Sequence, residues 1–219
     1  MGLGKTIQGL ALLLLRKNDG PALVVAPTSV CENWEREALR FAPVLNILRI
    51  SAQTGQAPED YKKERESIIK GAKKGDMIVT NYSLLQIEQE HFTDKKFATI
   101  ILDEAQAIKN ADTGRTRTAF NLVGDFRVAM TGTPIENHLG EFWSIFNFIN
   151  PGFLGTKQEF EQRYANADKQ TRQSLKNLIR PFLLRRTKSE VLKELPPKTE
   201  IQLDVELTKE ETALYETVR

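Results

Sequence analysis

The 219-residue sequence has one cysteine, two histidines and no long apolar run, and each scarcity excludes a class of protein. Because Cys31 is the single cysteine, the chain forms no internal disulfide, and it fits a reducing compartment. The histidines, His91 and His138, have no cysteine or histidine partner at metal-ligand spacing, which argues against a zinc site. No stretch reaches the ~18 consecutive apolar residues of a membrane-spanning helix, so we expect no membrane span.

The sequence also lacks an excess of charge of either sign. Its 31 basic and 29 acidic residues give a formal net charge of +2, so the chain as a whole does not attract a polyanion. If the chain binds nucleic acid, local loops and helix ends must make the contacts. Hydrophobic residues make up 40% and charged residues 27%, which is typical of a globular protein with one large domain, or a core domain with an appendage.

Short apolar runs alternate with amphipathic stretches over the first 150 residues. Runs bounded by breakers predict strands at 22–26, 45–50, 77–80, 97–102 and 127–130. Helical patterns lie between them at 7–17, 29–41, 61–74, 84–90 and 116–123. Strands that alternate with helices are typical of a parallel sheet covered on both faces. We therefore predict an α/β fold, in which three layers form from a parallel sheet flanked by helices.

The helix at 29–41 allows a more detailed prediction. Ser29 with Glu32 three residues later is a capping-box pattern, so the helix should begin there. Four apolar side chains recur at helical spacing and should face the core: Val30, Trp34, Ala38 and Phe41. We interpret Trp34 as a core aromatic side chain.

Beyond Leu139 the pattern becomes helical. An amphipathic helix at 139–149 ends at Pro151-Gly152, and further helices are predicted at 156–166, 168–179 and 187–195. Alternation at 200–207 predicts one more strand, and a last helix begins at Thr208. We therefore predict three parts: a core lobe at 1–150, a helical protrusion at 151–197, and a returning strand with the start of a linker helix at 198–219.

The start of the first helix carries the strongest motif. Gly4-Lys5-Thr6 is the second half of a phosphate-binding loop, G-x-x-x-x-G-K-[ST]. In such a loop, backbone N–H groups close on phosphate oxygens, the lysine reaches the outer phosphates and the hydroxyl binds Mg²⁺. The first residue of the full pattern would precede Met1, so we expect a fragment that lacks the strand before the loop.

Two more polar clusters follow predicted strands. Asp103-Glu104 comes after the run at 97–102, and adjacent carboxylates can divide the work, one holding Mg²⁺ and the other orienting the attacking water. Alone this pair would be an ordinary solvated helix start, but with the lysine loop it predicts a nucleotide-hydrolysing site. Thr131-Gly132-Thr133 ends the strand that we expect between the strands of those two motifs, where its hydroxyls can link the γ-phosphate to a neighbouring domain.

Together these motifs resemble the Swi/Snf family of helicase-like ATPases, within helicase superfamily two. The matching segments are residues 2–8 for motif I, 25–29 with Asn33-Trp34 and Glu37 for motif Ia, 80–82 for motif Ib, 103–106 with Lys109-Asn110 for motif II, and 130–137 for motif III. The appendage matches through 151–155, 181–186 and 195–198. The resemblance covers nearly the whole chain.

The resemblance implies a RecA-like first lobe with ATP and Mg²⁺ as cofactors. By analogy the catalytic residues are Lys5, Asp103, Glu104 and Gln106, with Glu104 as general base. The implied ATP-binding residues are Gly2, Leu3, Gly4, Lys5, Thr6, Ile7 and Gln8, and the implied Mg²⁺ ligands are Thr6 and Asp103. Nucleic-acid contacts carry over to Thr28, Ser29, Asn33, Thr80, Asn81, Tyr82, Lys109 and Asn110, and coupling to Thr131, Gly132 and Thr133. Gln106 departs from the family, since many members have histidine there.

The implied function is ATP-driven movement on double-stranded DNA. Its partners would be duplex DNA, a second RecA-like lobe that carries an arginine finger, and a DNA-bound protein target, with no membrane. The compartment would be the cytoplasm, at the nucleoid, in a prokaryote, or the nucleus in a eukaryote. Without the second lobe, we expect the isolated chain to be inactive. Two alternatives stay open: an RNA-directed superfamily-two helicase, and a non-catalytic nucleic-acid- or protein-binding module.

Overall fold

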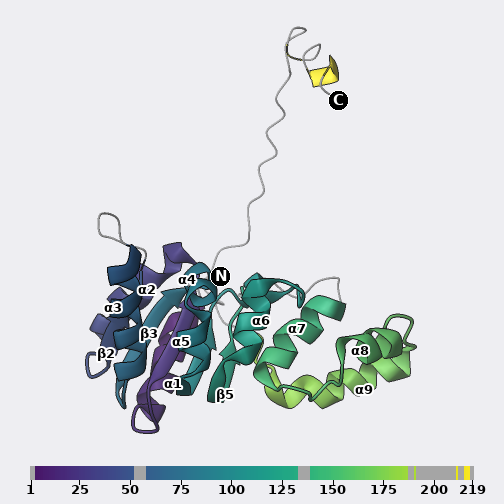
Figure 1. Ribbon diagram of the computed structural model, residues 1–219. Helices are drawn as coiled ribbons and strands as arrows, with labels where there is room; N and C mark the ends of the chain where they lie inside the picture. Colours follow the sequence, from purple (N-terminus) through teal and green to yellow (C-terminus); the bar gives the residue numbers. More distant parts are fainter. Residues whose placement is uncertain are drawn as a thin grey trace. The chain divides into compact units, whose positions relative to one another are not determined.

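The computed structural model describes residues 3–51, 58–132 and 139–186, together with 190, 211 and 215–217 (Figure 1). The chain divides into two units, Met1–Pro181 and Phe182–Arg219. In the second unit, residues 190, 211 and 215–217 have helical backbone. The strand predicted at 200–207 lies outside the described residues. The fold and the candidate site below therefore concern the first unit.

The first unit is built on a parallel sheet of five strands. These are β1 (Ala22–Ala26), β2 (Asn46–Arg49), β3 (Asp76–Asn81), β4 (Lys96–Leu102) and β5 (Val123–Ala129). They lie in the order β2-β3-β1-β4-β5, and every pairing is parallel. Val25 of β1 lies opposite Thr80 of β3 and Leu102 of β4, so the carboxyl ends of the central strands meet at one edge.

Helices cover both faces of this sheet (Figure 1). On one face lie α1 (Lys5–Arg16) and α2 (Thr28–Phe41), which pack against side chains of β1, β3 and β4. On the other face lie α3 (Pro58–Gly71), α4 (Tyr82–Ile87), α5 (Gln89–Thr93), the 3₁₀ turn η1 (Ala105–Ile108), α6 (Gly114–Asn121) and α7 (Leu139–Ile149). The predicted three-layer α/β fold is confirmed. None of the helices in the described part has the length and apolarity needed to cross a membrane.

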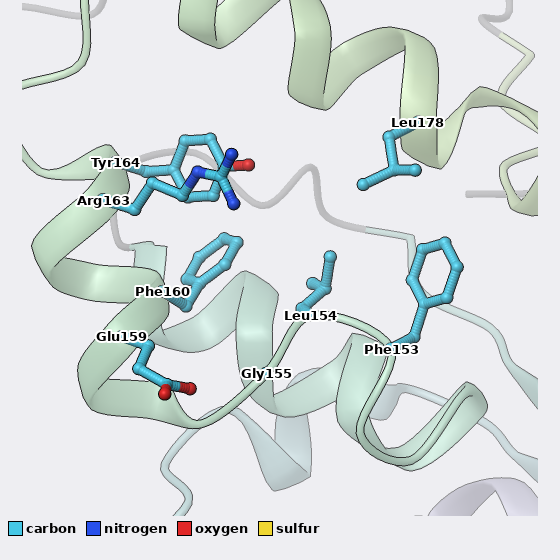
Figure 2. A pocket seen from close by; sticks show the side chains of 8 residues that line it. All are labelled: Phe153, Leu154, Gly155, Glu159, Phe160, Arg163, Tyr164 and Leu178. Carbon is cyan, nitrogen blue, oxygen red and sulfur yellow. The ribbon is translucent and has the colours of Figure 1, made fainter.

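The appendage continues from α7 as α8 (Lys157–Tyr164), α9 (Lys169–Ile179) and the 3₁₀ turn η2 (Arg180–Phe182). Thr156 caps α8 in a reciprocal capping box with Glu159, and Asp168 caps α9 by accepting from the Thr171 amide. Aromatic and aliphatic side chains line a pocket of about 270 Å³ between these helices (Figure 2). This pocket contains none of the predicted site residues.

Two predictions about the second helix were wrong. The second helix begins at Thr28 and not at Ser29, because Pro27 takes the N-cap position and its carbonyl accepts hydrogen bonds from the Val30 and Cys31 amides. No side chain caps this helix. Phe41 is 44% exposed because it is the last residue of the helix, whereas Trp34 and Ala38 are buried as predicted.

A buried ion pair joins α3 to the junction of α4 and α5. The guanidinium of Arg65 lies 2.8 Å from a carboxylate oxygen of Glu88, and their side chains are 15% and 2% exposed. Arg65 also donates to the carbonyl of Ser51 at 3.2 Å. Glu88 separates α4 from α5, where the sequence predicted one helix. The pair therefore holds three segments together.

We expect Glu88→Gln to lower the free energy of unfolding by about 3 kcal/mol, because it leaves the Arg65 guanidinium buried without a counter-charge. Urea unfolding of the intact protein measures the change. The matched control is Glu66→Gln on α3, the helix that carries Arg65, since Glu66 pairs with Lys70 at the surface and should contribute little. If the two variants lose equal free energy of unfolding, the buried pair stabilises the fold no more than the surface pair does.

Candidate functional site

The candidate site lies where the chain leaves the carboxyl ends of β4 and β5. Three backbone hydrogen bonds fix this edge: the Asp103 amide donates to the Val25 carbonyl, the Met130 amide to the Leu102 carbonyl, and the Ala105 amide to the Met130 carbonyl, each at 2.8 Å. The residues after neighbouring strands are thus held in register with one another. In open parallel sheets this edge is where ligands bind.

Lys5 meets Glu104 at this edge. Gly4 has φ 72°, a left-handed conformation that glycine adopts without strain, and α1 begins at the next residue. The ammonium of Lys5 then lies 3.1 Å from Oε1 of Glu104. The phosphate-loop motif and the carboxylate pair therefore face each other. The free N–H groups of the first turn of α1, with the Lys5 charge, make this a site for an anion.

Glu104 is held in an unusual conformation. With φ 47°, it is the one non-glycine residue with positive φ among those that the structure describes, a form of backbone strain that clusters at functional sites. Burial opposes ionisation of its carboxyl. Hydrogen bonds from Gln106, Lys5 and the Gly132 amide, together with the Lys5 charge, outweigh burial and hold its pKa below the usual value. Glu104 is therefore a carboxylate at neutral pH.

Gln106 bridges Glu104 to the end of β5. Its amide nitrogen donates to Oε2 of Glu104 at 2.9 Å, and its amide oxygen accepts from the Thr131 hydroxyl at 2.8 Å. A histidine in this position would titrate near neutral pH, whereas glutamine supplies the same donor and acceptor at every pH. A continuous chain of contacts thus runs from Lys5 through Glu104 and Gln106 to Thr131.

Asp103 is the most enclosed acidic group of the site, at 3% exposure. Its Oδ1 accepts from the Glu104 amide and its Oδ2 accepts from the indole N–H of Trp34, both at 2.9 Å. Its carbonyl accepts from the Tyr82 hydroxyl at 2.8 Å. Sequence reasoning placed Trp34 in the core but missed this contact. The signal was available, since a buried indole N–H needs an acceptor.

The residues present fit a Mg²⁺ site that substrate phosphates complete. Thr6, in the first turn of α1, and Asp103 offer the oxygen ligands that this ion prefers. The described residues contain no group of three or more His, Cys, Asp or Glu side chains able to hold a metal by themselves. Mg²⁺ is usually held by one or two carboxylates, waters and substrate phosphates, so Thr6 and Asp103 would be sufficient ligands from the protein.

The residues predicted to contact nucleic acid fall into two groups. Thr28 and Ser29 are exposed in the first turn of α2, where free N–H groups can hold a phosphate. Lys109 and Asn110 are also exposed, and Lys109 pairs with Glu141 at 3.0 Å. These four stay predictions.

The remaining four have other contacts. Asn33 donates to Glu37 and accepts from Arg36, and Asn81 caps α4 through its side-chain oxygen. Thr80 is fully buried and Tyr82 is 4% exposed. The side chains of Thr80 and Tyr82 are therefore part of the core, and a role of these four residues in DNA contact stays a prediction.

Two of the predicted ATP-binding residues, Ile7 and Gln8, lie near the start of α1. Gln8 donates to the carbonyl of Leu3 at 3.1 Å, and Ile7 is exposed beside them. Gly2, Thr133 and the rest of motif III to residue 137 lie outside the described residues. β5 pairs with β4, while its position relative to a strand before the phosphate loop stays a prediction.

Comparisons with known proteins agree with this geometry. Residues 1–219 match the model of the SNF2-related domain. The chain is 41% identical to a putative ATP-dependent helicase/translocase, YwqA, of Bacillus subtilis, covering 99% of this chain and 24% of that protein. It is 35% identical to the ISWI chromatin-remodeling complex ATPase CHR11 of Arabidopsis thaliana, covering 100% of this chain and 21% of that protein. The chain thus spans about a quarter or less of these relatives.

A solved structure shares the fold. The Sulfolobus solfataricus SWI2/SNF2 ATPase core in complex with dsDNA superposes with a TM-score of 0.73 at 36% identity. The match covers 99% of this chain and 45% of that one. The RecA-like α/β fold predicted from the sequence is confirmed.

Proposed function

The chain belongs to the SNF2-related domain family, and on that premise we propose that it is the first ATP-binding lobe of a motor that hydrolyses ATP and moves on double-stranded DNA. One observation carries the proposal. Lys5, Glu104, Gln106 and Thr131 form a connected set of polar contacts at the carboxyl edge of the sheet. A phosphate-binding lysine, an ionised carboxylate and a link to motif III are the parts that nucleotide hydrolysis needs.

The chemistry follows from these side chains. When ATP binds at the start of α1, Lys5 exchanges the Glu104 carboxylate for the outer phosphates. Oε1 of Glu104 is then free to accept a proton from the attacking water, while Gln106 keeps the carboxylate in place through Oε2. Thr6 and Asp103 would hold Mg²⁺, which supplies charge neutralisation on the phosphate oxygens. The Gln106 side chain hydrogen-bonds both Glu104 and Thr131, so a movement of Glu104 would also move Thr131.

The proposed partners are duplex DNA and a second RecA-like lobe. The exposed turn at Thr28-Ser29 is suited to a DNA phosphate, because a helix N-terminus attracts an anion. The related structure in complex with dsDNA supports the choice of duplex DNA. The second lobe would complete the site with an arginine, and the moved target would be a DNA-bound protein. In a prokaryote the motor would work at the nucleoid in the cytoplasm, and in a eukaryote in the nucleus.

We expect duplex DNA to accelerate ATP hydrolysis by the intact protein, because DNA held across the two lobes favours their closure around ATP. Steady-state hydrolysis is measured without nucleic acid, with duplex DNA and with single-stranded RNA of equal length, at a fixed salt concentration since phosphate contacts weaken with salt. Stronger stimulation by RNA would favour the RNA-directed helicase. No hydrolysis under any condition would favour the non-catalytic binding module.

A further inference from the structure

Trp34 of α2 donates a hydrogen bond to Asp103, a residue of the candidate site. The tryptophan lies in the middle of α2 and is fully buried. Its indole N–H donates to Oδ2 of Asp103 at 2.9 Å, across 69 positions of sequence. Charge-assisted hydrogen bonds of this kind, from a neutral N–H to a carboxylate, are stronger than bonds between neutral groups. This contact therefore influences how the Asp103 carboxylate is oriented.

Packing fixes the indole in the position from which it donates. A Cβ added to Gly9 of α1 would lie 2.6 Å from Cη2 of Trp34 and 2.8 Å from Cε of Met130. The six-membered ring thus lies directly on the backbone of the phosphate-loop helix, where no side chain larger than hydrogen fits. Met130, beside this ring, immediately precedes Thr131. Because Trp34 is fully buried and its ring lies against α1, the ring has little room to move away from Asp103.

Each of the two oxygens of Asp103 accepts one hydrogen bond. The Glu104 amide holds Oδ1 and the Trp34 indole holds Oδ2. An ionised carboxylate has about four lone-pair sites, so each oxygen keeps capacity for a further ligand. Partners that hydrogen-bond a metal ligand set its orientation, and removing one typically costs 10- to 100-fold in metal affinity or activity.

We propose that Trp34 is a positioning residue for Mg²⁺-dependent nucleotide binding, which acts by holding the Asp103 carboxylate in one orientation through its indole N–H. The inference rests on the proposed function, since it needs Asp103 as a Mg²⁺ ligand. It adds a role for the tryptophan of motif Ia that does not require contact with DNA.

The test uses Trp34→Phe in the intact protein, which keeps an aromatic ring but removes the N–H. Binding of a fluorescent ATP analogue is measured in EDTA and across a Mg²⁺ titration. In the variant, we expect the Mg²⁺ concentration that gives half of the Mg²⁺-dependent increase in analogue binding to rise about 10- to 100-fold. The affinity for the analogue in EDTA should stay at the wild-type value. The matched control is Trp143→Phe, because Trp143 of α7 also donates its indole N–H, to the Gly155 carbonyl at 3.0 Å, away from the site.

A second replacement separates the N–H from packing. Benzothienylalanine at position 34 keeps the bicyclic shape and has sulfur in place of the N–H. A Mg²⁺ requirement equal to wild type in this protein would overturn the inference, and a raised requirement would support it even if the phenylalanine variant folds poorly. Wild-type protein that binds the analogue equally with and without Mg²⁺ would instead contradict the proposed function.

Discussion

Replacing Glu104 with glutamine is expected to lower the rate of ATP hydrolysis by the intact protein by about 10²- to 10⁴-fold, the usual contribution of a general base. The carboxylate has a lowered pKa and is therefore ionised at neutral pH, so the change removes both the charge and the proton acceptor. ATP affinity should not weaken, because Lys5 loses the partner that competes with phosphate. Single-turnover hydrolysis and equilibrium binding of ATP measure the two effects separately.

The control for this variant is Glu90→Gln, an exposed carboxylate on α5 away from the site. It should hydrolyse ATP at the wild-type rate. The assignment of Glu104 as general base fails if Glu104→Gln retains more than about a tenth of wild-type turnover, since such a loss is smaller than proton transfer normally accounts for. A parallel loss of ATP affinity would point to damage of the phosphate site and not to loss of the base.

Lys5→Ala is expected to remove ATP hydrolysis and its stimulation by DNA. The ammonium lies at the start of α1 and is the nearest described cation to Glu104, so its loss removes the positive charge that would contact the outer phosphates. Removing one such group typically costs about 10²- to 10³-fold in rate. Because this charge acts on bound ATP as well as on the transition state, we expect weaker binding in addition to slower turnover.

The matched control is Lys17→Ala, at the C-cap of the same helix and therefore at its far end. It should leave binding and turnover unchanged. If Lys5→Ala hydrolyses ATP as fast as wild type, the phosphate-loop assignment is wrong. DNA binding by Lys5→Ala in the absence of ATP should persist, since the exposed turn at Thr28-Ser29 does not involve Lys5, and this measurement also reports that the variant is folded.

The strand bounds were predicted correctly for fully buried β1 and less accurately for partly exposed β5. The run at 22–26 matches β1 at both ends because all five of its residues are buried in the middle of the sheet. β5 begins four residues earlier than the predicted strand at 127–130. Its first residues include exposed Val123 and Phe126, so the sequence there mixes apolar and polar residues and shows no continuous run.

The sequence by itself determined the α/β class, the alternation of strands and helices along the chain, and the polar clusters that follow the predicted strands. These follow from local patterns, since apolar runs, breakers and parallel connections are visible within short windows. It also identified Lys5, Thr6, Asp103 and Glu104 as a group by motif. The tertiary structure alone decided which atoms meet: Lys5 with Glu104, Gln106 with Thr131, and Trp34 with Asp103. These partners are 25 to 99 positions apart, and such contacts depend on strand register and helix packing, which no local pattern encodes.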